Sequence, residues 1–202
     1  MIDFTNAPAR ALVAAVCMAL SSQVASAQAV NATPVRKSSL GLDIYEASEV
    51  VLGKLCMESR YDRRPMADLA KREAALAQRS TRYPGTGPND TVYRVGPITT
   101  QVYAVDWADG TCSARASGGD PEKLRALAER IILARPEGFT RGSHGPQDGG
   151  RVMRTVYCAQ SGSDILIASI TTPGASATRG TFALSSTVYR SPNSSPLCTA
   201  TL

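Results

Sequence analysis

The chain has 202 residues, of which 43% are hydrophobic and only 5% aromatic, and its formal net charge at pH 7 is +5. Basic residues alternate with acids along the sequence and few aromatic side chains accompany them, which argues against a nucleic-acid-binding protein. After the first 29 residues no run is long and apolar enough to span a membrane as a helix. We therefore expect a soluble globular protein.

The N-terminal segment has the features of a secretory signal peptide. Arg10 precedes an apolar run over residues 11–20, and a polar stretch ending in small residues follows. The run is far shorter than the roughly 20 residues that a membrane-spanning helix needs, and a buried N-terminal helix is the alternative. We expect a signal peptide over residues 1–29, cleaved after Ala27 or Ala29. Such a signal peptide predicts a periplasmic or secreted protein.

Four cysteines remain after this cleavage: Cys56, Cys112, Cys158 and Cys198. The fifth, Cys17, lies inside the apolar run and leaves with the signal peptide. An even number of cysteines in an exported chain predicts disulfide bonds, here with three alternative pairings. We favour Cys56–Cys112, which would join the first helix to a sheet, and Cys158–Cys198, which would hold the C-terminal tail.

Two helices are predicted in the first third of the chain, after a flexible leader over residues 30–41. Asp43 and Glu46 form a capping-box pattern, and apolar residues at helical spacing extend the predicted helix over 43–59. A proline suited to a first helical turn predicts a second helix over 65–79.

A hairpin follows these helices. Residues 83–90 contain two prolines and two glycines and are expected to form a loop. Residues 98–105 are rich in β-branched and aromatic side chains and predict a strand. Asp109 and the glycine after it form a turn into a second strand over 111–116.

The second half of the chain begins with the strongest helix-start signal. Asp120 precedes a proline and an acid, which predicts a helix up to about residue 135. The segment 141–150 contains four glycines and is expected to be a mobile loop. Three strands then follow, over residues 152–159, 165–171 and 181–190.

This order of elements predicts an α+β fold. Consecutive strands joined by short turns pair antiparallel, and helices gather on one face of the sheet. We expect a two-layer sandwich of about five mainly antiparallel strands with helices on one face, stapled by the disulfides. Residues 42–202 would form a single domain with a disulfide-tethered C-terminal tail.

No catalytic residue, metal ligand or cofactor site is predicted. His144 is the single histidine and lies in the glycine-rich segment, which is a poor position for a catalytic imidazole. The cysteines lack the close spacing of a zinc site. Ser143-His144-Gly145 is similar to the start of the Ser-His-Gly-Cys motif of L,D-transpeptidases, but Pro146 occupies the nucleophile position and excludes that activity.

Two places qualify as binding sites. Asp106 and Asp109 flank Trp107 at the predicted hairpin turn. They either bond to their own turn backbone, or act as a sugar-binding or glycosidic pair beside a stacking indole ring. Tyr189 lies with hydroxyl side chains on the polar face of the last strand, which either faces solvent or binds a partner or glycan.

The sequence therefore favours a non-catalytic binding module of the bacterial cell envelope. Its partner would be an envelope protein or an anionic envelope component, because the chain is basic. The alternative is a small periplasmic hydrolase acting on envelope polymers through Asp106, Asp109 or His144. The single histidine and the few acids favour the binding module.

Overall fold

The computed structural model describes residues 41–73, 83, 85–96, 101–177, 182–192 and 195–198, together with the backbone of 77–80. The predicted signal peptide and nearly all of the predicted leader lie outside the described residues. The helical elements are α1 (Ile44–Glu49), η2 (Val50–Met57), α2 (Glu58–Arg60), α3 (Met66–Arg72), α4 (Pro121–Leu133) and η4 (Asp148–Gly150). The strands are β1 (Ala77–Ser80), β2 (Thr91–Val95), β3 (Val102–Asp106), β4 (Cys112–Ala116), β5 (Thr140–Gln147), β6 (Val152–Ser161), β7 (Asp164–Pro173) and β8 (Leu184–Pro192).

The first helical segment begins at the predicted capping box. The Asp43 carboxylate accepts hydrogen bonds from the backbone N–H groups of Tyr45 and Glu46 at 2.9 and 2.8 Å. The Glu46 carboxylate in turn accepts from the Asp43 N–H at 3.2 Å. Because α1, η2 and α2 follow one another without a break up to Arg60, the predicted helix over 43–59 is confirmed.

The second helix is shorter than predicted. It starts at Met66 after the expected proline, but α3 ends at Arg72. The predicted continuation to residue 79 is wrong, because Ala77–Ser80 forms β1 and pairs antiparallel with β2. The apolar residues of this segment have helical spacing, but backbone hydrogen bonds to the neighbouring strand stabilise a strand instead.

The strands form one sheet in the order β1-β2-β3-β4-β8-β7-β6-β5, with every pair antiparallel. The fold is therefore mixed α+β, as predicted, but the expected five strands are too few. The predicted strands correspond to β3, β4, β6, β7 and β8, whereas β1, β2 and β5 were not expected. Of these eight strands, β2 to β8 are described with their side chains.

The predicted glycine-rich loop is instead largely strand β5. It pairs with β6, with a register shift between Arg141 and His144. Strand β5 lies at the edge of the sheet, and its backbone hydrogen bonds to β6 hold it in the extended conformation. The strand propensities of its side chains do not predict this pairing. The mobile loop that the glycines predicted over residues 141–150 is therefore wrong for most of this segment.

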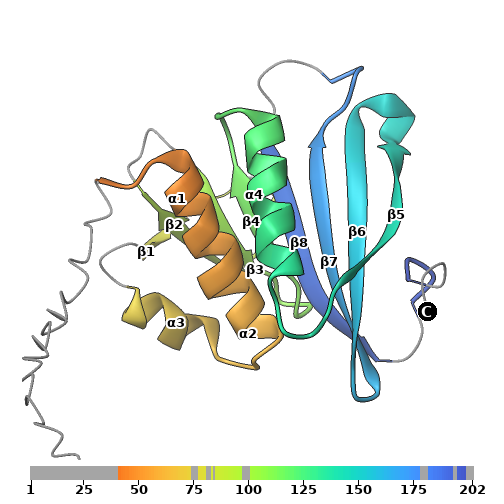
Figure 1. Cartoon of the computed structure of the whole chain (residues 1–202). Coiled ribbons are helices and arrows are strands. Elements are labelled where there is room, and N and C mark those ends of the chain that lie inside the picture. The colour runs from red at the N-terminus through yellow and green to blue at the C-terminus, as the bar shows by residue number, and fades with distance from the viewer. Residues whose placement is uncertain are drawn as a thin grey trace, which may run out of the picture. The chain divides into compact units, whose positions relative to one another are not determined.

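Helix α4 follows its predicted start. The Asp120 carboxylate accepts from the N–H groups of Glu122 and Lys123 at 2.9 and 3.2 Å, and Pro121 occupies the first turn. The helix ends at Leu133, close to the predicted limit. Figure 1 shows α4 and the α1–η2–α2 segment lying in front of the same face of the sheet.

The main hydrophobic core lies between these helices and the sheet. Leu55 of η2, Leu124 of α4 and Leu166 of β7 are all completely buried there. Burying one such side chain stabilises a fold by roughly 1.5–3 kcal/mol. The apolar stripe of each helix and the alternate residues of each strand therefore share one core.

Two disulfides join distant parts of the chain, with the predicted pairing. Cys56 of η2 is bonded to Cys112 of β4, and their Cα atoms are 5.3 Å apart. Cys158 of β6 is bonded to Cys198 in the tail, with Cα atoms 5.9 Å apart. The second bond lies in a smaller buried cluster that also contains Val156, Ile165 and Ile167. Within the described residues, no helix has both the length and the apolarity to cross a membrane.

Candidate functional site

The sheet has a second face, opposite the helices, which we call the outer face. Figure 1 views the sheet from the helical side, so this face is turned away from the reader. Because side chains alternate along each strand, the registers place one row of residues across six strands of this face. The row comprises Arg94, Tyr103, Arg115, Ser185, Thr171 and Arg154.

Acidic side chains are missing from the described strands on this face. The only two acids in these strands are Asp106 and Asp164. Asp106 pairs with Arg60 of α2, and Asp164 pairs with Arg190 at 2.5 Å. Arg190 also donates to the backbone carbonyl of Arg60 at 2.9 Å, so both carboxylates point to the helical side. Among the described strands, no carboxylate shares the outer face with Arg115 and Arg154.

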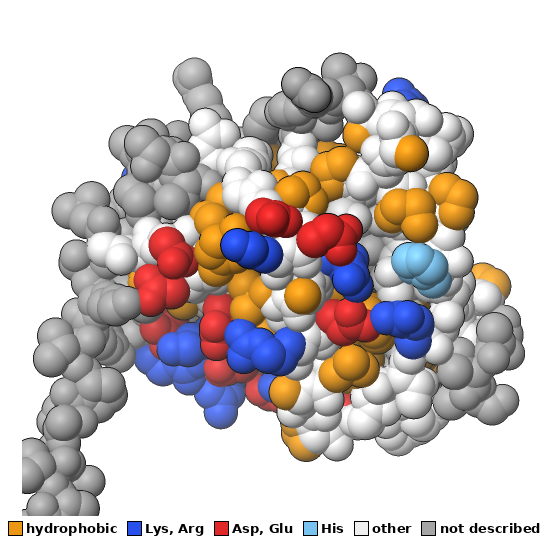
Figure 2. Space-filling model, turned by 45° about the horizontal axis from the view of Figure 1, so that its top comes forward, with side chains coloured by type: hydrophobic (Ala, Val, Ile, Leu, Met, Phe, Trp, Pro, Cys, Tyr) orange, Lys and Arg blue, Asp and Glu red, His pale blue; other side chains and the backbone are white. Residues whose placement is uncertain are grey.

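The helical side has the opposite character, because its charges neutralise one another. Glu129 of α4 pairs with Arg125 at 3.0 Å and with Arg141 at 2.5 Å, and it accepts from the Tyr157 hydroxyl at 2.8 Å. Partial burial acts to raise the pKa of Glu129, but the hydrogen bonds from Tyr157 and Arg141 lower it overall. Figure 2 shows acidic and basic side chains side by side over the helices.

Arg115 lies at the centre of an aromatic cluster on the outer face. Its guanidinium carbon is 5.4 Å from the ring centroid of Tyr83 and 5.9 Å from that of Trp107. Tyr83 also packs against Tyr103, with the two ring centroids 5.2 Å apart. Both arginine contacts are within cation–π range. We call Tyr83, Tyr103, Trp107 and Arg115 the aromatic–arginine cluster.

The Arg115 guanidinium is poorly satisfied by the described part of the protein. Its Nη1 donates to the Tyr83 hydroxyl at a long 3.4 Å, and its buried Nε has no acceptor there. No carboxylate of the described residues forms an ion pair with it. A buried donor without a partner costs about 1–3 kcal/mol, so this arrangement needs an explanation other than stability.

A short hydrogen-bond chain fixes the indole ring of the cluster. Trp107 Nε1 donates to Ser113 Oγ at 2.9 Å, and Ser113 Oγ lies 3.3 Å from Thr187 Oγ1 on β8. Ser113 is only 2% exposed, so the chain is largely shielded from water. A ring held in this way loses little freedom when a ligand contacts it.

The structure separates the residues that the sequence grouped at the hairpin. Trp107 belongs to the cluster, whereas Asp106 points to the helices. Asp109 accepts a hydrogen bond from the Thr111 N–H at 2.8 Å, which matches the structural interpretation of a turn residue. Asp106 and Asp109 therefore do not form a pair around the indole ring.

Tyr189 lies on the outer face, as the predicted alternation of β8 implies. It packs beside the smaller buried cluster that contains the Cys158–Cys198 bond. Partial burial raises the pKa of Tyr189, while the positive charge of Arg154 acts in the opposite direction. Tyr189 and Arg154 therefore lie close enough to interact electrostatically.

His144 lies at the far edge of the sheet, in β5. Its Nδ1 is 2.8 Å from the Thr155 hydroxyl, which holds the imidazole against β6. Five strand spacings of about 4.8 Å separate β5 from β3, or roughly 24 Å. His144 is therefore not brought together with Asp106 or Asp109.

Sequence reasoning missed Tyr83, Tyr103 and Arg115. Tyr103 and Arg115 face each other across the β3–β4 hairpin. The alternation of each strand could have placed both on the polar face, had the register been known. The position of Tyr83 carried no such signal, because it precedes β2 in a segment that reads only as a loop.

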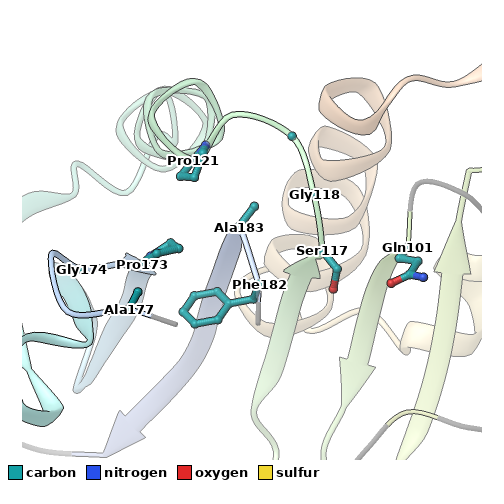
Figure 3. A pocket seen from close by; sticks show the side chains of 10 residues that line it. Gln101, Ser117, Gly118, Pro121, Pro173, Gly174, Ala177, Phe182 and Ala183 are labelled. Atoms are coloured by element: carbon teal, nitrogen blue, oxygen red, sulfur yellow. The ribbon is translucent and has the colours of Figure 1, made fainter. Parts of the chain in front are cut away.

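A cavity of about 600 Å³ lies at the end of the sheet where α4 begins. Its lining is made of glycines, prolines and alanines with one serine, one glutamine and one phenylalanine. Figure 3 shows these side chains, with Pro121 at the first turn of the helix. None of the described lining residues is titratable, so they supply neither an acid nor a base for catalysis.

The part of the chain that the structure describes contains no group of three His, Cys, Asp or Glu side chains that could hold a metal ion. The chain matches no known protein family, no curated protein and no solved structure. The outer face and its aromatic–arginine cluster are the feature with most potential for recognition.

Proposed function

We propose that the protein is a non-catalytic binding module of the bacterial cell envelope that recognises an anionic component through its outer face. The observation that carries this proposal is Arg115, whose guanidinium is within cation–π range of two aromatic rings and has no carboxylate partner among the described residues. Arginine in such a setting recognises carboxylate or phosphate groups with both charge and shape.

Location in the periplasm or outside the cell belongs to the same proposal. The N-terminal sequence has the order of a secretory signal peptide, and both disulfides join segments far apart in the chain. Disulfides of this kind persist in oxidising compartments.

The alternative hydrolase is less well supported. Its three candidate residues lie in different places: Asp106 on the helical side, Asp109 in a turn and His144 at the sheet edge. A glycosidase needs two carboxyl groups about 5–9.5 Å apart across a cleft, and the cavity offers none among its described residues.

The test is capture of envelope material on the immobilised, disulfide-intact chain. We expect the chain to retain an anionic component and the Arg115→Gln variant to lose it. Arg130→Gln is the matched control, because Arg130 lies on α4 in an exposed ion pair with Glu49 at 3.6 Å. Release of new reducing ends or amines from the captured material would instead identify an enzyme.

A further inference from the structure

We infer that the ligand of the outer face is an acidic polysaccharide, in which a carboxylate meets Arg115 and the sugar ring contacts the aromatic–arginine cluster. This inference rests on the proposed function and specifies its ligand class. It is carried by three properties of the outer face: an arginine that lacks an anion among the described residues, aromatic rings beside hydroxyl groups, and a second arginine, Arg154, along the same row.

The first property is the unsatisfied guanidinium. Arg115 presents a planar fork of N–H donors, and within the described residues only the long bond to Tyr83 uses one of them. Residue Arg115 as a whole is partly exposed, so the end of the fork is accessible although Nε is buried. A carboxylate accepts two parallel hydrogen bonds from such a fork.

The second property is the chemistry around the guanidinium. Trp107 and Tyr83 offer apolar ring surfaces, while Thr187 and Ser185 of the neighbouring strand offer hydroxyl groups. A sugar ring has apolar faces and a polar rim of hydroxyls, and this set of side chains complements both. A small inorganic anion has no apolar surface that could contact the two rings.

The third property is the repetition of positive charge. Arg115 is three strands from Arg154, or about 14 Å between backbones at the usual strand spacing. Thr171 and Ser185 lie between Arg115 and Arg154 in the same row. A chain with repeated acidic groups can follow such a row, whereas a single small anion occupies one point.

A membrane surface fits this face less well than a polysaccharide. Proteins that bind membranes peripherally insert apolar side chains beside their basic residues. Among the described residues, the one large hydrophobic side chain that is exposed is Leu133, at 48%, and it belongs to α4 on the helical side. Among the described residues, the outer face thus offers charge, hydroxyls and partly buried aromatic rings, but no fully exposed apolar side chain that could insert into a membrane.

The experiment is calorimetric titration of the disulfide-intact chain with polygalacturonate. Neutral dextran and vesicles containing phosphatidylglycerol are the comparison ligands. We expect polygalacturonate to bind and dextran to bind far more weakly. Arg115→Gln should weaken binding by about tenfold or more, since a hydrogen bond to a charged group is lost, and Trp107→Ala should also weaken it. Arg130→Gln should change the affinity less than about twofold, because an exposed pair on the other face contributes little.

A conservative variant separates specific recognition from attraction by charge alone. Arg115→Lys keeps the charge but loses the planar fork, so it should also bind clearly more weakly than the native chain. Thermal unfolding of each variant shows whether it is folded. If Arg115→Gln does not fold, Arg115→Lys replaces it in the binding experiment.

Three results would overturn the inference. One is equal weakening by Arg115→Gln and Arg130→Gln, which would mean attraction by net charge. Another is binding to vesicles in preference to polygalacturonate. The third is failure to bind any of these ligands while envelope capture still depends on Arg115, which would leave the proposed function standing with a different ligand. If the capture experiment also failed, both the proposed function and the inference about its ligand would be refuted.

Discussion

Removal of the two disulfides one at a time should destabilise the protein unequally, although their loops are similar. The bonds join residues 56 and 40 positions apart. Loop-closure entropy alone assigns about 4 kcal/mol to each, with a difference of less than about 0.5 kcal/mol. Any larger difference must therefore come from the folded state.

The folded state differs at the two bonds. Cys56 and Cys112 are completely buried between η2 and β4, inside the main core. The double variant Cys56→Ala, Cys112→Ala cannot relax there, so it should lose about 4 kcal/mol of unfolding free energy plus the packing of two buried sulfurs.

The second bond holds a short tail. Cys158 connects β6 to Cys198, and the tail packs on a small cluster with Leu197. In the variant Cys158→Ala, Cys198→Ala the tail can detach, and the folded state then regains conformational freedom. The folded state then gains entropy as well as the unfolded chain, and the two gains partly cancel. The free energy of unfolding should therefore fall by less than about 4 kcal/mol.

Urea unfolding followed by circular dichroism measures both losses, and hydrogen exchange reports whether the tail detaches. Alanine is used because a serine would bury an additional polar group. An equal or greater loss for the Cys158–Cys198 variant would refute the reasoning. So would a tail that stays protected from exchange in that variant.

Three further predictions concern the folded framework. Asp43→Ala should cost about 1 kcal/mol in urea unfolding, because the capping box is lost, whereas Asp43→Asn should cost less. Burial, followed by the hydrogen bond to Glu129, raises the pKa of Tyr157 to about 12, so its contribution to stability is present below pH 10 and lost as pH rises towards 12. Tyr157→Phe should remove one late-titrating phenolate from an absorbance titration, and an unchanged titration would contradict this. Gly174→Ala places a Cβ 2.3 Å from a carbonyl oxygen of the β5–β6 connection and should cost about 1–3 kcal/mol, while Gly145→Ala, with no atom within 4 Å, should be tolerated.

Local signals were the most reliable part of the sequence. The caps at Asp43 and Asp120 predicted two helix starts, because each cap bonds to N–H groups within three residues. The turn at Asp109 is likewise held by a bond to the backbone two residues on. The favoured pairing of the cysteines is also confirmed, although the sequence left three pairings open and the choice rested on which segments needed to be held to the sheet.

Long-range pairing decided what local signals could not. Strand β5 exists because β6 bonds to its backbone, and β1 because β2 does, in segments whose side chains favour a loop and a helix. Composition and spacing do not encode such hydrogen bonds, which depend on the partner strand.

The candidate site shows the same division most clearly. The sequence by itself identified Trp107 and the polar alternation of the last strand, because both are properties of neighbouring residues. Only the tertiary structure turned Asp106 towards Arg60 and placed Arg115 within cation–π range of both Trp107 and Tyr83. The physical reason is register: a shift of one residue moves a strand's side chains to the other face, and contacts across the whole fold set that register.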